Sequence, residues 1–438
     1  MIPMIDHDDE SMTVEDRTWI GLVLGLWLTG VFAGSLFGRM EGRKSHLYEI
    51  IMLGSLLWPV GYFLLSRCRF IPAGFSPGTI AGLAVFGIFC GFSALVSRAP
   101  LESTQYTALT ILAILIALQF NTNLDAVQYE RGMKVYAVLM AVLVSGFALY
   151  DYVPGRRLGG GKEILNPASF ALVTMSVFIT AMAVRRALIR IPILITMGIV
   201  IYLTGARASA LAAMFGLAIT LFLRRRSAGT SGYLLLVGCF VIGVTLAAWY
   251  SEAVMRGATD FFAVQDRHRG LDSGGSGRLE TWKATWNLFL AHPIFGVGFR
   301  AHEVVLKVAS SAHNGYLALL AEIGVIGFGA VLFVALSGLW RTWRRNQDPS
   351  HTFSYSVLIG LACGYFVLAI FERYFINAGN PTSLLFLLGI LVPSLSHDES
   401  EIAGHTYASH ESETEEFIGD SVDDDLREVR PEMWGVRS

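Results

Sequence analysis

Charged residues are scarce in this chain of 438 residues: Asp, Glu, Lys and Arg make up 16% of it, against 53% hydrophobic residues. Soluble globular proteins carry roughly 25% charged residues, so a soluble multidomain protein is excluded. The few charges nearly cancel, with 33 Lys and Arg against 35 Asp and Glu. This balance lacks the basic excess of a nucleic-acid-binding protein. The composition predicts an integral membrane protein with no nucleic-acid partner.

Cysteine is rare too, and the four cysteines, Cys68, Cys90, Cys239 and Cys363, show no CxxC spacing. Neither a disulfide framework nor a structural zinc site is therefore predicted. Positive charge is missing from the N-terminus, where residues 1–17 hold six acids and a single basic residue. A cleaved signal peptide has the opposite charge, so we expect the first apolar run to stay in the membrane as a helix.

Long apolar runs are abundant. A hydrocarbon core about 30 Å thick requires roughly 20 apolar residues per helix. Twelve runs approach this length, which predicts an all-α polytopic membrane protein with about 12 transmembrane helices. They lie near 18–38, 47–66, 79–97, 104–120, 133–150, 167–185, 191–204, 208–223, 232–250, 314–340, 353–372 and 381–396.

The distribution of Lys and Arg predicts the orientation of these spans. Alternate loops, which we therefore place in the cytoplasm, contain the cations Arg185, Arg186, Arg190, Arg224, Arg225, Arg226, Arg341, Arg344 and Arg345. Both termini are then cytoplasmic. The expected organisation is an acidic N-terminus (1–17), nine transmembrane helices (18–250), a large periplasmic loop carrying amphipathic helices (251–313), three more helices (314–396) and a disordered acidic tail (397–438). The cations Arg39, Arg43 and Lys44, between the first two spans, oppose this orientation.

Three arginines on the outer side are candidate functional residues, because charge inside or beside the hydrocarbon core is costly. Arg207 lies at a tight turn between two apolar runs, Arg278 opens an amphipathic stretch, and Arg157 precedes three consecutive glycines. The structural alternatives are a snorkelling helix-end cation for Arg207 and a salt bridge with Glu280 for Arg278. For Arg157, a functional role and a purely structural role remain open.

The segment 278–291 and the histidine that follows it are further candidates. Trp282 and Trp286 share one face of an expected helix, which suits either the bilayer surface or stacking on sugar rings. His313 lies just before the next apolar run, where the helix dipole favours neutral imidazole, the form that acts as a general base. The alternative is an ordinary interfacial polar residue. Metal binding is not predicted, because the neighbouring histidines lack metal-ligand spacing.

The segment around His313 resembles the signature of a known family. His313-Asn314, nine further residues and Gly324-Val325-Ile326-Gly327 are similar to the His-Asn/Ser/Gln, nine residues, Gly-x-x-Gly/Thr/Tyr motif of the O-antigen ligase and O-antigen polymerase family of bacterial membrane glycosyltransferases. Other segments that look like this family's large periplasmic loop are Ser276-Gly277-Arg278, Trp282, His292-Pro293, Gly296-Val297-Gly298 and Glu322. Thr204-Gly205-Ala206-Arg207-Ala208 is similar too, although the family commonly has Ser before this Arg and Gly after it. The resemblance covers roughly residues 150–340.

The resemblance implies a GT-C-type enzyme that transfers glycan from undecaprenyl pyrophosphate to an acceptor hydroxyl at the periplasmic face. His313 would be the general base, and Arg207, Arg278 and Arg157 would bind the pyrophosphate in place of a divalent cation. This implies a metal-independent, inverting glycosyltransferase without a cofactor, and a polyprenyl chain held in an apolar groove between helices. Candidate contacts of the glycan or lipid are Trp282, Trp286, Asn314, Tyr316 and Glu322.

The acceptor distinguishes the members of such a family. A ligase that docks a phosphorylated lipid A core favours a strongly cationic outer loop, whereas residues 251–313 hold seven cations against six acids. This favours a polymerase of O-antigen, capsule or exopolysaccharide in the bacterial inner membrane, with the lipid-linked donor, a glycan or lipid-linked acceptor, the bilayer and other polysaccharide assembly proteins as partners. The alternatives are an O-antigen ligase, a transporter or lipid-linked sugar flippase, and a scaffold protein.

Overall fold

The computed structural model describes residues 14–37, 46–65, 74–159, 166–224, 278–306, 312–347, 352–373, 375–376 and 381–393. The chain divides into two units, Met1–Pro393 and Ser394–Ser438, and every described residue belongs to the first. The predicted span 232–250 and the acidic tail lie outside the described residues, as does most of the predicted acidic N-terminus.

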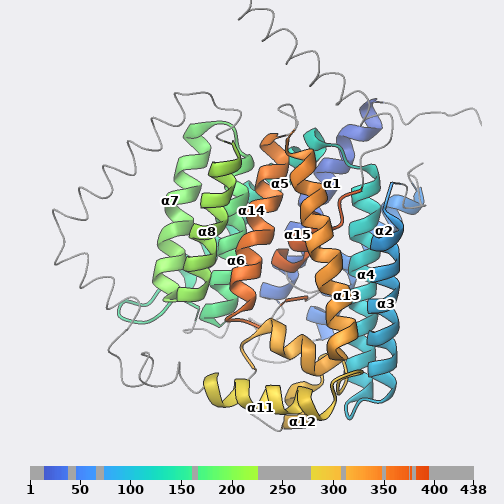
Figure 1. Ribbon diagram of the computed structural model, residues 1–438. Helices are drawn as coiled ribbons and strands as arrows, with labels where there is room; N and C mark the ends of the chain where they lie inside the picture. The colour runs from blue at the N-terminus through green and yellow to red at the C-terminus, as the bar shows by residue number, and fades with distance from the viewer. Residues whose placement is uncertain are drawn as a thin grey trace, which may run out of the picture. The chain divides into compact units, whose positions relative to one another are not determined.

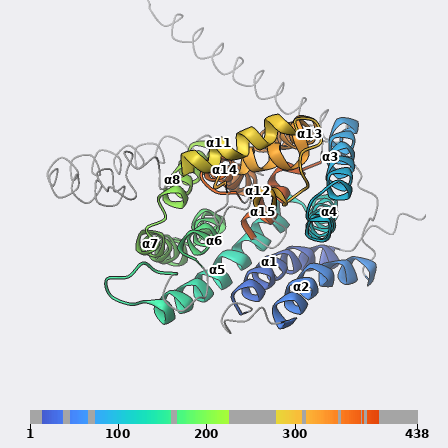
Figure 2. The same cartoon turned by 90° about the horizontal axis from the view of Figure 1, so that it is seen from below.

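The described part of the chain is all-helical, as predicted. Its helices are α1 (Val14–Phe37), α2 (His46–Leu65), α3 (Pro77–Leu95), α4 (Pro100–Asn123), α5 (Ala126–Asp151), α6 (Pro167–Thr180), a short 3-10 helix η1 (Ala181–Ala183), α7 (Ala187–Thr204), α8 (Arg207–Arg224), α11 (Arg278–Ala291), α12 (His302–Leu306), α13 (Gly315–Arg345), α14 (Thr352–Ala369) and α15 (Pro381–Ile390). Most of them run roughly alongside one another in a bundle, while α11 and α12 lie across its lower end in Figure 1. Figure 2 shows α11 crossing this end of the bundle.

Six of these helices are long and apolar enough to cross a membrane: α3, α4, α5, α7, α8 and α13. Three further apolar segments are shorter, at Trp19–Ala33, Pro167–Ala183 and Phe353–Ala369. The prediction of a multi-pass membrane protein is therefore confirmed, while the number of twelve spans stays a prediction. The end of the bundle at which α5, α7 and α14 finish and α6, α8 and α13 begin is called the α11 end below.

Glycines let α8 and α14 pack closely in antiparallel directions. An added Cβ on Gly360 of α14 would come within 2.6 Å of Gly216 O on α8, and one on Gly364 within 2.8 Å of Ala212 O. Small residues at such contacts allow the helix backbones to approach closely. In lipid the hydrophobic effect does not hold helices together, so the van der Waals contacts of this close packing stabilise the pair. This contact sets the position of α8 relative to the end of α14.

The variant Gly360→Ala tests this packing. Its methyl group would also lie 1.9 Å from Thr220 Oγ1, so we expect a destabilisation of about 1–3 kcal/mol, the usual cost of overpacking. The measurement is the thermal unfolding midpoint of the detergent-solubilised protein. Gly329→Ala on α13 is the control, because nothing lies within 4 Å of its added Cβ. Equal midpoints for both variants would contradict the described contact.

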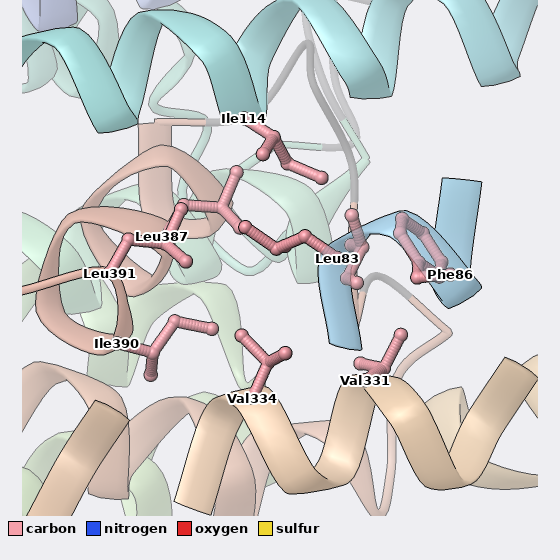
Figure 3. A pocket seen from close by; sticks show the side chains of 9 residues that line it. Leu83, Phe86, Ile114, Val331, Val334, Leu387, Ile390 and Leu391 are labelled. Carbon is pink, nitrogen blue, oxygen red and sulfur yellow. The ribbon is translucent and has the colours of Figure 1, made fainter. Parts of the chain in front are cut away.

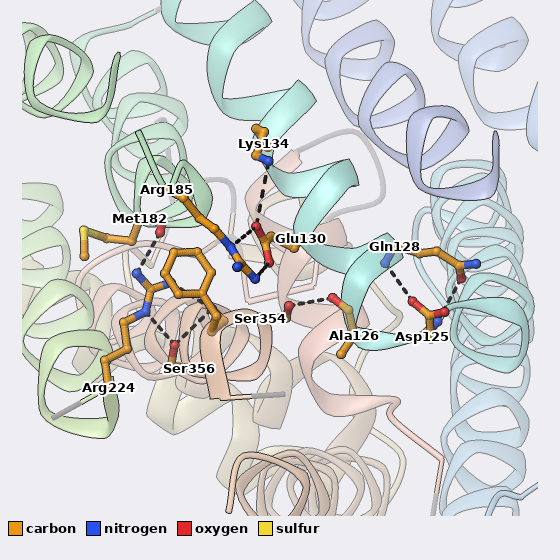
Figure 4. Close-up of polar contacts among 11 residues, drawn as sticks. Asp125, Ala126, Gln128, Glu130, Lys134, Met182, Arg185, Arg224, Ser354 and Ser356 are labelled. Carbon is orange, nitrogen blue, oxygen red and sulfur yellow. Dashed lines mark hydrogen bonds and ion pairs between the residues drawn. The ribbon is translucent and has the colours of Figure 1, made fainter. Parts of the chain in front are cut away.

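The end of the bundle opposite α11 holds a network of polar groups, from the buried Glu130 and Arg224 to the exposed Arg185 (Figure 4). Arg185 donates to both carboxylate oxygens of Glu130 at 2.7 Å, and this hydrogen-bonded pairing raises the pKa of the Arg185 guanidinium. Arg224, at the end of α8, donates to the carbonyls of Met182 and Phe353 and lies 3.7 Å from the centre of the Phe353 ring. These contacts connect α5, α8 and α14 at the end that the arginine distribution assigns to the cytoplasm.

Candidate functional site

His313 lies at the start of α13, in a conformation that few residues adopt. Asn314 caps this helix, because its Oδ1 accepts hydrogen bonds from Tyr316 N and Leu317 N, both at 3.0 Å. The preceding residue, His313, has a positive φ of 45°, in the left-handed region that is uncommon for non-glycine residues. Its side chain is 38% exposed, whereas its Nδ1 atom is buried.

Glu372 brings His313 and Arg278 together. It follows α14, and its side chain is only 7% exposed. One carboxylate oxygen lies 3.5 Å from His313 Nδ1 and the other 3.8 Å from Arg278 Nη2. The general base and one phosphate-binding arginine predicted from the sequence therefore meet at a buried acid that the sequence analysis did not single out. The sequence feature that could have identified Glu372 is an acidic residue at the end of an apolar span.

The backbone next to Glu372 packs directly against the start of α13. An added Cβ on Gly315 would come within 2.8 Å of Phe375 Cβ and 3.1 Å of Glu372 O. Only a residue without a side chain allows this approach. The glycine two positions after His313 thus sets the distance between the predicted base and the segment that carries the acid.

Two further pairs join the elements around this site. Glu303 of α12 forms an ion pair with Arg373, the residue after Glu372. His302, also on α12, lies with its Nδ1 2.5 Å from Glu322 Oε1 on α13, and both side chains are buried. Glu322, predicted as a glycan or lipid contact, is therefore used inside the protein to hold α12 against α13.

The glycine motif after His313 has a structural explanation. Gly324, at φ 69°, interrupts α13, and the freed backbone groups bond the segment after α11. Val297 N donates to Ala321 O at 3.0 Å and Val325 N to Pro293 O at 2.8 Å. An added Cβ on Gly324 would come within 2.0 Å of Ile294 O. The motif therefore anchors the segment between α11 and α12 to α13.

Arg207 and Arg157 lie at the same end of the bundle. Arg207 is the first residue of α8, and α8 packs antiparallel against α14, so Arg207 lies at the end of the bundle where α14 finishes. Arg157 Nε donates to Thr204 O at 2.7 Å, next to Gly205, which ends α7 with a positive φ of 59°. Arg207, at the α7–α8 turn, and Arg157, which follows α5 and donates to that turn, therefore both lie at the α11 end.

The predicted aromatic contacts differ in their surroundings. Trp286 on α11 is 44% exposed, with its ring centre 5.1 Å from that of Phe289, whereas Trp282 is half-buried. Tyr316 packs inside the bundle, because its hydroxyl donates to Phe366 O at 2.8 Å. Among these aromatic side chains, the one open to a sugar ring is Trp286.

The described residues contain an apolar crevice between α3, α4, α13 and α15 (Figure 3). Its lining is Leu83, Phe86, Ile114, Val331, Val334, Ile376, Leu387, Ile390 and Leu391. The free space inside it is about 20 Å³, enough for roughly one water molecule, which is far less than a long polyprenyl chain occupies. The expected groove for the polyprenyl chain therefore stays a prediction.

The comparison with protein families agrees with this geometry. Residues 192–332 match the family model described as O-antigen ligase. The segment 192–332 is thus similar to an O-antigen ligase domain. This segment runs from α7 into α13, so it includes Arg207, Arg278 and His313, while Arg157 and Glu372 lie outside the matched residues. No curated protein matches the chain. Within the described segments, no group of three His, Cys, Asp or Glu side chains is placed to hold a metal ion.

Proposed function

We propose that this protein is a membrane glycosyltransferase that transfers glycan from undecaprenyl pyrophosphate to an acceptor hydroxyl during cell-surface polysaccharide biosynthesis. The observation that carries the proposal is the position of Glu372, between His313 Nδ1 at 3.5 Å and Arg278 Nη2 at 3.8 Å. An imidazole that is 38% exposed and has its Nδ1 next to a buried carboxylate is placed as a general base would be, with the carboxylate available to orient it as it takes up a proton. The similarity to an O-antigen ligase domain supports the same reaction type.

The proposed step needs one base and one cationic site. With Nδ1–H directed to Glu372, His313 Nε2 accepts the proton of the acceptor hydroxyl as its oxygen forms a bond to the anomeric carbon. The bond from that carbon to the pyrophosphate breaks, and the leaving group departs with the electron pair. Arg278, together with Arg207 and Arg157, stabilises the developing negative charge, as guanidinium forks do well. A single displacement inverts the anomeric configuration, and product retaining the donor configuration would contradict it.

Glu372 acts in this proposal as a positioning residue, because it orients His313 and does not touch the substrate. Glu372→Gln keeps the size of the side chain but removes its charge, so we expect kcat to fall about 10- to 100-fold, as for other residues that orient a reacting group. The KM for the donor should change much less. The measurement is steady-state transfer by the reconstituted protein, with Glu280→Gln, an exposed acid on α11, as the control. An unchanged kcat would remove Glu372 from the mechanism.

A polymerase is the favoured form of this enzyme, with an O-antigen ligase as the alternative. The support is the charge of residues 251–313, seven cations against six acids, which gives little attraction for a phosphorylated lipid A core. Location in the bacterial inner membrane with the α11 end facing the periplasm is part of the proposal. Its support is that Arg185, Arg224 and Arg345 lie at the opposite end, as cytoplasmic arginines do.

A host lacking its own enzyme provides the test. We would complement it with the wild type and with His313→Ala, and analyse surface glycans and lipid-linked intermediates by gel electrophoresis. Single repeat units accumulating on undecaprenyl pyrophosphate in the variant would support a polymerase. Long glycan accumulating there would mean a ligase. Unchanged glycans would contradict the enzyme and favour a transporter or flippase.

A further inference from the structure

The segment that carries Glu372 makes a second ionic contact, through the next residue in the chain. Glu372 and Arg373 are neighbours in the chain, yet Glu372 faces His313 and Arg278 while Arg373 pairs with Glu303. The side chains of Arg373 and Glu303 are 18% and 31% exposed. An ion pair that is partly shielded from water is screened less by salt than a surface pair.

The partner of Arg373 stands on a short but anchored helix. α12 has only five residues, too few to be stable by itself. It is fixed by His302, the residue before Glu303, which lies 2.5 Å from Glu322 on α13 with both side chains buried. Buried acid and imidazole groups in contact resist displacement, because separating them leaves an unpaired polar group away from water. The contact between His302 and Glu322 therefore holds Glu303 of α12 in a fixed position relative to α13.

We propose that the Glu303–Arg373 ion pair is a positioning device for the reaction, which fixes Glu372 between His313 and Arg278 without touching the substrate. The inference rests on the proposed function. The ion pair holds the segment after α14 next to α12. The close contact of this segment with Gly315 fixes its distance from α13. Between these two constraints, the carboxylate of Glu372 faces the base.

A charge exchange tests the inference. Arg373→Glu and Glu303→Arg each place like charges together, so each single variant is expected to lower kcat at least about tenfold, with the donor KM little changed. The double variant restores an ion pair in the reverse sense and is expected to recover at least about threefold of the loss, within the coupling seen for residues in contact. The assay is glycan transfer by the reconstituted full-length protein, with Lys283→Glu on exposed α11 as the control.

Three results would overturn the inference. Single variants with wild-type kcat would show that the pair does not position Glu372. A double variant that regains the thermal unfolding midpoint but not kcat would make the pair purely structural. A raised donor KM without rescue would make Arg373 a donor ligand. Failure of the proposed function is distinguishable, because the wild type itself would then transfer no glycan. The thermal unfolding midpoints of the wild type, the two single variants and the double variant would still show whether the ion pair forms.

Discussion

Replacing His313 is expected to lower the rate of glycan transfer by about 10²- to 10⁴-fold, the usual contribution of a positioned general base. Without the imidazole, the acceptor hydroxyl has no group to take its proton as it attacks. Donor binding should be retained, because the pyrophosphate is assigned to the arginines. The measurement is the initial rate of transfer by the purified protein in liposomes, together with donor binding under the same conditions.

Two variants and one control separate chemistry from folding at this position. His313 has a φ of 45°, which alanine adopts less readily than asparagine, so His313→Asn removes the base at lower conformational cost than His313→Ala. His292→Ala is the matched control, because His292 is exposed after α11 and lies outside the group around Glu372. Wild-type transfer by His313→Asn would eliminate the general-base assignment.

Replacing Arg278 by alanine is expected to lower kcat about 10²- to 10³-fold, the loss seen when one donor to a developing anion is removed. The departing pyrophosphate would lose a positively charged group that can donate two hydrogen bonds to it. Arg278→Lys should recover only a small part of the rate, because an ammonium group cannot form the bidentate contact. The measurement is kcat with the lipid-linked donor at saturation.

Lys283→Ala is the control for Arg278, because both residues lie on α11 and Lys283 is exposed. It should leave transfer near the wild-type rate. If Arg278→Lys were fully active, simple charge at this place would suffice, and the proposed phosphate clamp would be wrong. If Arg278→Ala changed only the unfolding midpoint, the contact of Arg278 with Glu372 would be structural.

Much of the fold was predictable because it depends on local composition. The expected spans 18–38 and 47–66 correspond to α1 and α2 within a few residues, since a run of apolar residues in lipid has few alternatives to a helix. The expected amphipathic helix 278–291 coincides with α11 (Arg278–Ala291). Helix ends were less predictable: α4 extends to Asn123 and α13 to Arg345, because polar residues continue a helix beyond the apolar run.

The site was predictable only in part, because its central contact joins distant segments. The candidates His313 and Arg278 followed from residue type and place, and the structure brings both to Glu372. Glu372 follows a different helix, α14, and no local pattern connects it to α11 or α13. Likewise, the sequence predicted Glu322 as a glycan or lipid contact, whereas the structure shows it beside His302 of α12, twenty residues earlier in the chain.

The most direct test of the central claim is a transfer assay with defined components. The purified protein, reconstituted in liposomes, would receive an undecaprenyl-pyrophosphate-linked repeat unit, and both glycan products and released undecaprenyl pyrophosphate would be measured for the wild type and for His313→Asn. The account predicts elongated glycan and stoichiometric undecaprenyl pyrophosphate from the wild type and neither from the variant. Movement of the intact lipid-linked unit across the bilayer without release of undecaprenyl pyrophosphate would contradict it and identify a transporter.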